Sequence, residues 1–553
     1  MKNFDIPIIY RSPLISAIKN RRRLQDKMKK DFTPTLLDLS GHTGANPGSD
    51  QHTNTNSTGP QSADSNASGA HSVTPNPGSN QPINTNSTGP QSISAQSGAA
   101  SSTATQSANS DPGGTHSTNP NGGLHIYLAR HFGFCYGVEN AIEISFRTID
   151  ENPGKRIFLL SEMIHNPQVN ADLLSRGIQF LQDTHGGQLI PFETLTKDDI
   201  VIIPAFGTTL EIEERLRAIG IQTEKYNTTC PFVEKVWNRS TQIAQKNYTI
   251  VVHGKPGHEE TRATFSHAAA ATPTVVVKDM KEAKILAEYI KGTLPPDSFY
   301  TTFKGQYSEG FDVKKDLTRI GVVNQTTMLA SDTQAIADYL KQTMIEIYGL
   351  PETPASSNNG APTTTSNPNA AANASTDATS DPTLSISDYF ADTRDTLCYA
   401  TLDNQSAVIG LLDTPADLAI VVGGYNSSNT SHLVELCEEK MPTYFISSEE
   451  KILSQQEILH YNFHEKREGT TKDWLFSQKA PLPQAAAAPS PTSTSQPAAT
   501  TPASAASLPP PKPLSILITS GASCPDALVE AVIRKIASYY ATPDQIEKMV
   551  AEF

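Results

Sequence analysis

The side chains best suited to redox or metal chemistry are five scattered cysteines, Cys135, Cys230, Cys398, Cys437 and Cys524. They are too few and too far apart for the disulfide framework of a small secreted domain. No two of them have the C-x-x-C spacing, which argues against a zinc ribbon and a thioredoxin-like site. Taken singly, each cysteine is by default a small buried apolar side chain.

Polar groups gather where buried strands are expected to end. Cys135 follows one strand, and four others are followed by HGKPGHEET (253–261), NQTT (324–327), NSSN (426–429) and TSGAS (519–523). Because ligands bind beyond the carboxyl ends of parallel strands, these segments together indicate one shared site.

Each polar segment also has a plainer interpretation. NSSN and TSGAS suit ordinary helix N-caps, NQTT suits a satisfied strand end, and His165, His253 and His258 suit surface or core positions. NSSN and TSGAS equally suit an anion, because helix N-termini offer free N–H groups and the positive end of a dipole.

The elements that must position these groups alternate along the chain. Short apolar runs followed by amphipathic helices predict α/β units with parallel sheets. Strands are expected at 124–129, 199–207, 248–254, 318–325, 416–424, 443–447 and 515–521. Helices are expected from Val138 and within 210–220, 331–349, 431–440 and 525–540, and another should follow Cys230.

Three segments have a composition that cannot form a packed core. Residues 41–123, 351–383 and 480–513 consist mainly of Ser, Thr, Asn, Ala, Gly and Pro, and NTNSTGPQS occurs twice in the first. They bury too little apolar surface to offset chain ordering, so we expect disordered linkers. Roughly 360 residues remain outside them and the first 40, enough for two or three domains.

The net charge of the chain argues against one class of partner. A net charge of −14 disfavours general nucleic-acid binding. The exception is a basic extension, residues 1–40, which we expect to be a solvated helix face or a flexible arm. No run of 18 apolar residues and no signal-peptide pattern is present, so we expect no membrane span and a cytoplasmic protein.

Nine ordered motifs together resemble the 4-hydroxy-3-methylbut-2-enyl diphosphate reductase family. PAFGTT, HGKPGHEET and NSSNTSHL are most similar to the cyanobacterial and plant branch. The full set is HFGFCYGVENAI, EMIHNPQVN, PAFGTT, TTCPFVEKVW, HGKPGHEET, NQTTML, LCYATLDNQSAV, GGYNSSNTSHL and TSGASCPDALVE, between about residues 124 and 540.

The resemblance implies three small α/β domains around one [4Fe-4S] cluster, with each domain supplying a cysteine. The matching ligands are Cys135, Cys230 and Cys398, which leave one iron open, whereas Cys437 and Cys524 are expected to be packing residues. The domains would be 124–230, 231–350 and 384–479 continued by 514–553, with the strand in 124–134 fitting either the first or the third.

The reaction implied by the resemblance converts an allylic alcohol carrying a diphosphate to isopentenyl and dimethylallyl diphosphate plus water. Family matching gives Glu260 the role of proton donor and Thr326 that of orienting the hydroxyl. It also implies an electron donor, a ferredoxin or a flavodoxin. The expected diphosphate ligands are His165, His258, Ser427, Ser428, Asn429 and Ser523.

Two local features qualify this picture. Phe206 stands where many bacterial members have a histidine, so His258 should carry more of the diphosphate. Glu259 and Glu260 are adjacent, and neighbouring residues rarely both face a narrow site, so we expect Glu259 to be nearly silent. Two rival functions remain open: a non-redox hydro-lyase with an open iron, and a non-enzymatic Fe–S sensor on the same fold.

Overall fold

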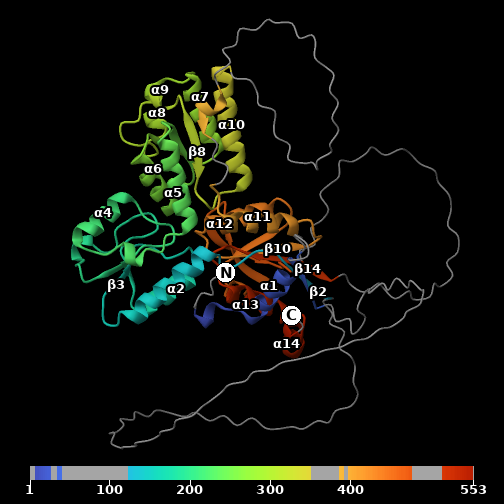
Figure 1. The fold of residues 1–553 in the computed structure, drawn as a ribbon. Helices are drawn as coiled ribbons and strands as arrows, with labels where there is room; N and C mark the ends of the chain where they lie inside the picture. Colours follow the sequence, from blue (N-terminus) through green and yellow to red (C-terminus); the bar gives the residue numbers. More distant parts are fainter. Residues whose placement is uncertain are drawn as a thin grey trace, which may run out of the picture. The chain divides into compact units, whose positions relative to one another are not determined.

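The computed structural model describes residues 7–26, 34–39, 123–349, 385–391, 396–475 and 513–551. The three segments predicted to be disordered lie outside these ranges, apart from residues 123 and 513. The described residues have the expected α/β class, with three sheets dominated by parallel pairs and one antiparallel hairpin (Figure 1). None of the described helices is long and apolar enough to cross a bilayer.

The largest sheet has five strands in the order β1-β2-β14-β10-β11. All neighbours pair in parallel except β1 and β2. Its central strands are continuous apolar runs because helices cover both faces of a buried parallel sheet. The strands are β1 (Thr35–Asp38), β2 (Leu124–Leu128), β10 (Leu418–Val422), β11 (Thr443–Ile446) and β14 (Leu514–Ser520).

Helices from both ends of the chain accompany this sheet. The strand at 124–128 pairs with β14, so it lies with the segments expected to form the third domain. The helices are α1 (Pro13–Asp26), α11 (Tyr399–Leu411), α12 (Ser428–Glu438), α13 (Asp526–Ala537) and α14 (Pro543–Ala551), with short turns at Ile8–Tyr10 and Glu449–Lys451. A hairpin of β12 (Glu457–Asn462) and β13 (Arg467–Lys472) follows β11.

A second sheet is small, with three parallel strands in the order β4-β3-β5. Its strands are β3 (Ile157–Leu159), β4 (Gln179–Phe180) and β5 (Ile200–Ile202). The helices along this part of the chain are α2 (Tyr136–Glu151), α3 (Pro167–Ser175) and α4 (Leu210–Ile219), with short turns at Phe192–Thr194 and Glu224–Tyr226. Two apolar clusters, on opposite sides of these short strands, form its core.

The third sheet has four parallel strands in the order β7-β6-β8-β9. Every residue of β6 and β8 is buried, which explains why both strands are visible in the sequence as apolar runs. The strands are β6 (Thr249–His253), β7 (Thr274–Val277), β8 (Ile320–Asn324) and β9 (Phe390–Ala391). The helices are α5 (Pro231–Ala244), α6 (Glu259–Ala269), α7 (Met280–Lys291), α8 (Pro296–Thr302), α9 (Val313–Asp316) and α10 (Ala330–Tyr348), with a turn at Ile386–Asp388.

The basic N-terminal extension is packed against the five-stranded sheet. Leu14, Ile15 and Ile18 of α1 are essentially unexposed. The expectation of a solvated basic face is wrong for Arg22, which is 7% exposed and donates hydrogen bonds to the carbonyls of Leu128, Ala129 and Arg130. Strand β2 ends at this point, and the guanidinium satisfies carbonyl groups there that would otherwise be buried without partners.

Candidate functional site

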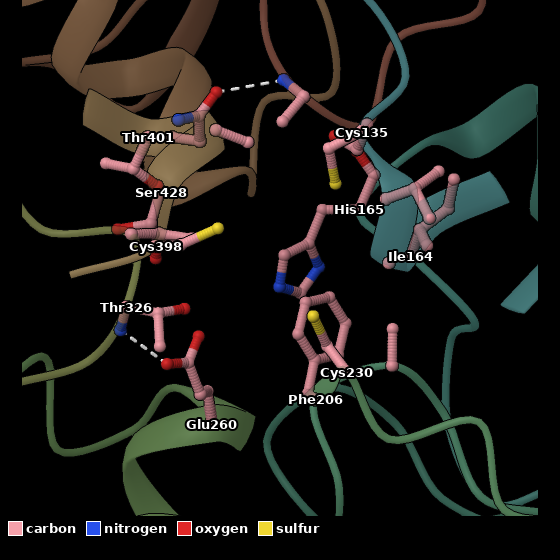
Figure 2. A pocket seen from close by; sticks show the side chains of 18 of the residues that line it. Cys135, Ile164, His165, Phe206, Cys230, Glu260, Thr326, Cys398, Thr401 and Ser428 are labelled. Carbon is pink, nitrogen blue, oxygen red and sulfur yellow. Dashed lines mark hydrogen bonds between the residues drawn. The ribbon is translucent and has the colours of Figure 1, made fainter. Parts of the chain in front are cut away.

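Three of the five cysteines stand directly before the first residue of a helix and line one cavity. Cys135, Cys230 and Cys398 are the N-cap residues of α2, α5 and α11. Figure 2 shows their sulfur atoms directed into the same space. The cavity holds about 650 Å³, including its mouth, a size that suits a cofactor together with a small substrate.

Backbone contacts tie each cysteine to a distant part of the site. The N–H of Cys135 donates to Ala522 O at 3.2 Å, that of Cys230 to Ala205 O at 3.0 Å, and that of Cys398 to Thr326 O at 3.2 Å. A Cβ on Gly137 would stand only 2.5 Å from Cys230 Sγ, so glycine is required where α2 meets this thiol. The three cysteines therefore belong to one packed arrangement.

The electrostatics of the thiols reflect a closed space. Burial raises the pKa of Cys135 to about 12, and the nearby Cys398 and Cys230 add to the rise. Burial likewise raises the pKa of Cys230 to about 11, and it raises that of Cys398. Backbone N–H groups in the first turn of each helix act in the opposite direction, because they stabilise a thiolate.

These three residues fit an iron–sulfur cluster better than a single metal ion. Within the described ranges no three His, Cys, Asp or Glu side chains stand close enough to hold one ion. A cluster presents several iron atoms to separate thiolates, so free thiols arranged around a space suit it. Cys437 and Cys524 are fully buried in the apolar core of the five-stranded sheet, as expected for packing residues.

Glu260 of α6 and Thr326 of the loop after β8 lie next to each other on one side of the cavity. The N–H of Thr326 donates to Glu260 Oε1 at 2.5 Å (Figure 2). Burial raises the pKa of Glu260 to about 7, and the backbone and side-chain hydrogen bonds of Thr326 oppose that rise. A carboxyl group with this pKa carries a proton for much of the time near neutral pH, which suits a general acid.

Glu259 and Glu260 do not both face the cavity, as expected, but Glu259 makes a contact that the sequence did not indicate. Glu259 does not line the cavity, yet it is 5% exposed, and its Oε2 lies 3.5 Å from His165 Nε2. Both carboxylates belong to the buried first turn of α6, which places them on different sides of the helix. Glu259 therefore contacts His165, a residue that lines the cavity.

His165, His258 and Phe206 pack together on one side of the cavity. His165 stacks on Phe206 with ring centroids 4.3 Å apart, and its Nε2 lies 3.2 Å from His258 Nε2. His258 Nδ1 accepts from the N–H of Glu260, so neutral His258 carries its proton on Nε2, directed toward His165. Burial keeps the pKa of His258 well below its usual value.

A row of small polar residues lies along the loops after β10 and β14. Asn429 Oδ1 accepts from Ala522 N at 2.9 Å, and Ser523 Oγ donates to His165 O at 3.2 Å. Ser428 Oγ, Asn429 Nδ2 and His165 Nδ1 are buried without hydrogen-bond partners. Buried donors of this kind are costly unless a ligand satisfies them, so the row fits a ligand rich in acceptor oxygens.

The structure brings every site residue expected from the sequence into this cavity. It also adds Thr327 and Thr401, which line it beside Thr326 and Cys398. Both lie within motifs recognised in the sequence, NQTT and LCYATL, but neither stood out from its neighbours. His253 does not line the cavity, and its Nδ1 instead lies 3.1 Å from Thr333 Oγ1.

The comparisons with known proteins agree on one family. The family model described as LytB protein matches residues 126–537. The 4-hydroxy-3-methylbut-2-enyl diphosphate reductase of Picosynechococcus sp. is 35% identical over 423 residues, covering 76% of this chain and 86% of that protein. The enzyme of the same name from Gloeobacter violaceus is 32% identical, covering 75% of this chain and 83% of its own.

One of the solved structures that resemble the chain is the E-1-hydroxy-2-methyl-but-2-enyl-4-diphosphate reductase of Plasmodium falciparum. It is 19% identical and has a TM-score of 0.45, covering 74% of this chain and 86% of that one. The family assignment rests instead on the sequence matches, which span most of the chain and most of each relative. The chain belongs to the LytB family of 4-hydroxy-3-methylbut-2-enyl diphosphate reductases.

Proposed function

We propose that the protein reduces (E)-4-hydroxy-3-methylbut-2-enyl diphosphate to isopentenyl and dimethylallyl diphosphate, with release of water. The observation that carries this proposal is the meeting of three free thiols, a carboxyl group with a pKa of about 7 and a row of unsatisfied polar donors in one cavity. Membership of the reductase family supports it.

Glu260 would supply the proton that the departing hydroxyl needs. Hydroxide is a poor leaving group, and a positioned acid typically contributes about 10²–10⁴-fold to such a step. Thr326 fixes the carboxyl group through its N–H, while its hydroxyl faces the same cavity and can orient the substrate alcohol.

The diphosphate would lie against the polar row and the two histidines. Ser427 caps α12 by accepting from Thr430 N, which leaves Ser428, Asn429 and Ser523 to face an anion. The N-terminus of α12 adds a favourable dipole. His258 carries its proton on Nε2, which faces His165, so it can donate to a phosphate oxygen that replaces this contact without becoming charged.

Cys135, Cys230 and Cys398 would hold a [4Fe-4S] cluster. When bound, such a cluster supplies electrons and, at an iron without a protein ligand, a Lewis acid for the leaving oxygen. The electrons would come from a carrier protein, a ferredoxin or alternatively a flavodoxin. The expected cytoplasmic location stays a prediction.

Anaerobically purified protein, reduced with dithionite and methyl viologen, tests the function directly. We expect viologen oxidation to depend on the diphosphate alcohol, with two electrons consumed for each product molecule. A hydro-lyase would form product without viologen oxidation, and a sensor would bind a cluster but release no product. Either outcome would overturn the proposed reaction.

A further inference from the structure

Helix α11, whose N-cap is Cys398, exposes apolar side chains close to the cavity. Its buried face carries the apolar Val408 and Leu411 as well as three polar residues, Thr401, Asn404 and Gln405, and Thr401 lines the cavity (Figure 2). Its outer face presents Tyr399, Leu402 and Ile409, which are 42%, 40% and 55% exposed. A surface helix normally turns its apolar side inward, so this outer face suits a partner that covers it.

The apolar face continues into an aromatic layer next to the cysteines. Tyr136 and Tyr399 each directly follow a cysteine of the cavity, and Phe232 lies two residues after the third. The rings of Phe232 and Tyr399 are 4.9 Å apart. Burial and the nearby thiols raise the pKa of Tyr399 to about 12, while the N–H of Tyr136 opposes the rise. Tyr136 and Tyr399 are 40% and 42% exposed, so this aromatic layer lies at the surface beside the thiols.

The charges beside this layer differ from those of the whole chain. Five cations and three carboxylates act on one another or on His131 here: Arg11, Lys19, Arg22, Arg23 and Arg130, with Glu139, Asp403 and Asp526. Lys19 pairs with Asp526 at 2.8 Å. The chain as a whole has a formal charge of −14, so an acidic protein is repelled less here than by the average surface.

We propose that the outer face of α11, together with Tyr136, Phe232 and Tyr399, is the docking surface for a small acidic carrier protein with an iron–sulfur centre. This inference rests on the proposed function, which requires electrons that no described residue supplies. Each reduced carrier is oxidised by one electron. Two carriers, with two protons, convert one diphosphate alcohol to product and water.

The surface suits this occupant because it begins at Cys398, one of the three thiols of the cavity. Electron transfer slows steeply with distance, and a carrier docked on α11 approaches the cavity beside the aromatic layer. A weak redox encounter also buries a small, partly apolar interface, which matches a few exposed apolar side chains bordered by mixed charges.

The test compares two reductants on the cluster-loaded full chain. A plant-type [2Fe-2S] ferredoxin must dock, whereas methyl viologen needs no interface. We expect the double variant Leu402→Glu and Ile409→Glu to raise the KM for ferredoxin about tenfold or more, in the range of a lost interface anchor. Leu402→Lys should raise it less, because its charge attracts an acidic carrier.

The controls separate this inference from the proposed function. Leu174→Glu, an equally exposed leucine on α3 (46%), should leave both reactions unchanged. Absence of viologen-driven turnover in the unaltered protein would defeat the function itself. An unchanged ferredoxin KM in the double variant would defeat the docking surface alone. The docking surface would also be defeated if sedimentation showed that the double variant dissociates a dimer without any change in the ferredoxin KM. The face would then be covered by a second copy of the chain.

Discussion

The cavity has two walls that the fold builds in different ways. The thiol wall consists of Cys135, Cys230 and Cys398, which follow strands of three different sheets. The polar wall lies at the N-terminus of α12, which follows β10, and in the loop after β14; these two strands are neighbours in a single sheet. It consists of Ser427, Ser428, Asn429 and Ser523.

The two walls therefore depend on contacts of different range. The polar wall follows from one parallel strand pair, because both loops leave the same edge. The thiol wall exists only when three sheets pack together, and each thiol is held by a backbone contact to a remote segment. A substitution in the thiol wall should therefore abolish turnover, whereas a substitution in the polar wall should only weaken it.

The largest effect should come from the thiol wall. Changing Cys135, Cys230 or Cys398 singly to alanine should abolish turnover and lower the iron content of anaerobically purified protein. Cys437→Ala and Cys524→Ala are the matched controls, because both side chains are buried away from the cavity. Full activity and iron content in a Cys398→Ala variant would contradict the ligand assignment.

The next largest effect should separate chemistry from binding. Glu260→Gln keeps the shape and the hydrogen bond with Thr326 but cannot give up a proton, so kcat should fall by about 10²-fold or more. Substrate binding, followed by the absorption spectrum of the loaded enzyme, should change little.

The pH dependence of turnover provides a second measurement of the same group. With a pKa of about 7, Glu260 loses its proton as the pH rises through that value, so kcat of the unaltered enzyme should fall above about pH 7. The Gln variant should lack this dependence. A variant that retains it would place the acid elsewhere.

The polar wall should respond by weaker binding. Ser428 Oγ has no partner in the folded protein, so Ser428→Ala removes a ligand contact without removing a structural one. A hydrogen bond to a charged group is worth about 1.5–3 kcal/mol, which predicts a KM raised roughly ten- to hundredfold. Ser427→Ala also removes the cap of α12 and should lower the melting temperature as well. Equal KM values for Ser428→Ala and the unaltered protein would move the diphosphate elsewhere.

Changing Glu259 should have a smaller effect than changing either wall. Its carboxylate lies near His165 and outside the cavity, so Glu259→Gln should raise KM several-fold, on the scale of a single weakened hydrogen bond, with kcat nearly unchanged. A kcat loss as large as that of Glu260→Gln would show that both carboxylates serve the chemical step.

The smallest effect should come from the segments outside the described residues. Leu39 N donates to Leu124 O at 2.8 Å, and Tyr348 stacks on Tyr389 at 3.7 Å, so the ends of two of these segments already meet. Loop-closure cost rises only about 0.6 kcal/mol per doubling of length. Replacing 41–120 and 352–380 with short Gly/Ser connectors should leave turnover within a few-fold, and loss of cluster-loaded protein would contradict this.

Long apolar strands and motif residues could be predicted from the sequence. β6, β8, β10 and β14 are wholly or almost wholly buried, and their apolar runs reveal them. β3 and β4 have three and two residues, too short for a periodicity. β13 reads REGTTK and is mostly exposed, so only its pairing with β12 makes it a strand.

The remaining features depend on contacts between distant residues. Nothing local distinguishes Arg22 from the exposed Arg21 and Arg23, because its burial depends on carbonyls more than 100 positions away. The burial of Glu259 likewise depends on His165. Sequence patterns report a residue's own element, whereas these positions are determined by the packing of one element against another.

Strand β1 also bears on the solubility of shortened forms of the protein. It occupies the outer position of the five-stranded sheet, next to β2. A chain that begins after residue 40 would leave β2 as the edge, with a row of unpaired backbone groups that can recruit another strand. β1 ends the sheet instead with a four-residue strand that carries the exposed Asp38, and short or charged edge strands resist further pairing. We therefore expect a truncated form to associate in solution even where its cavity is intact.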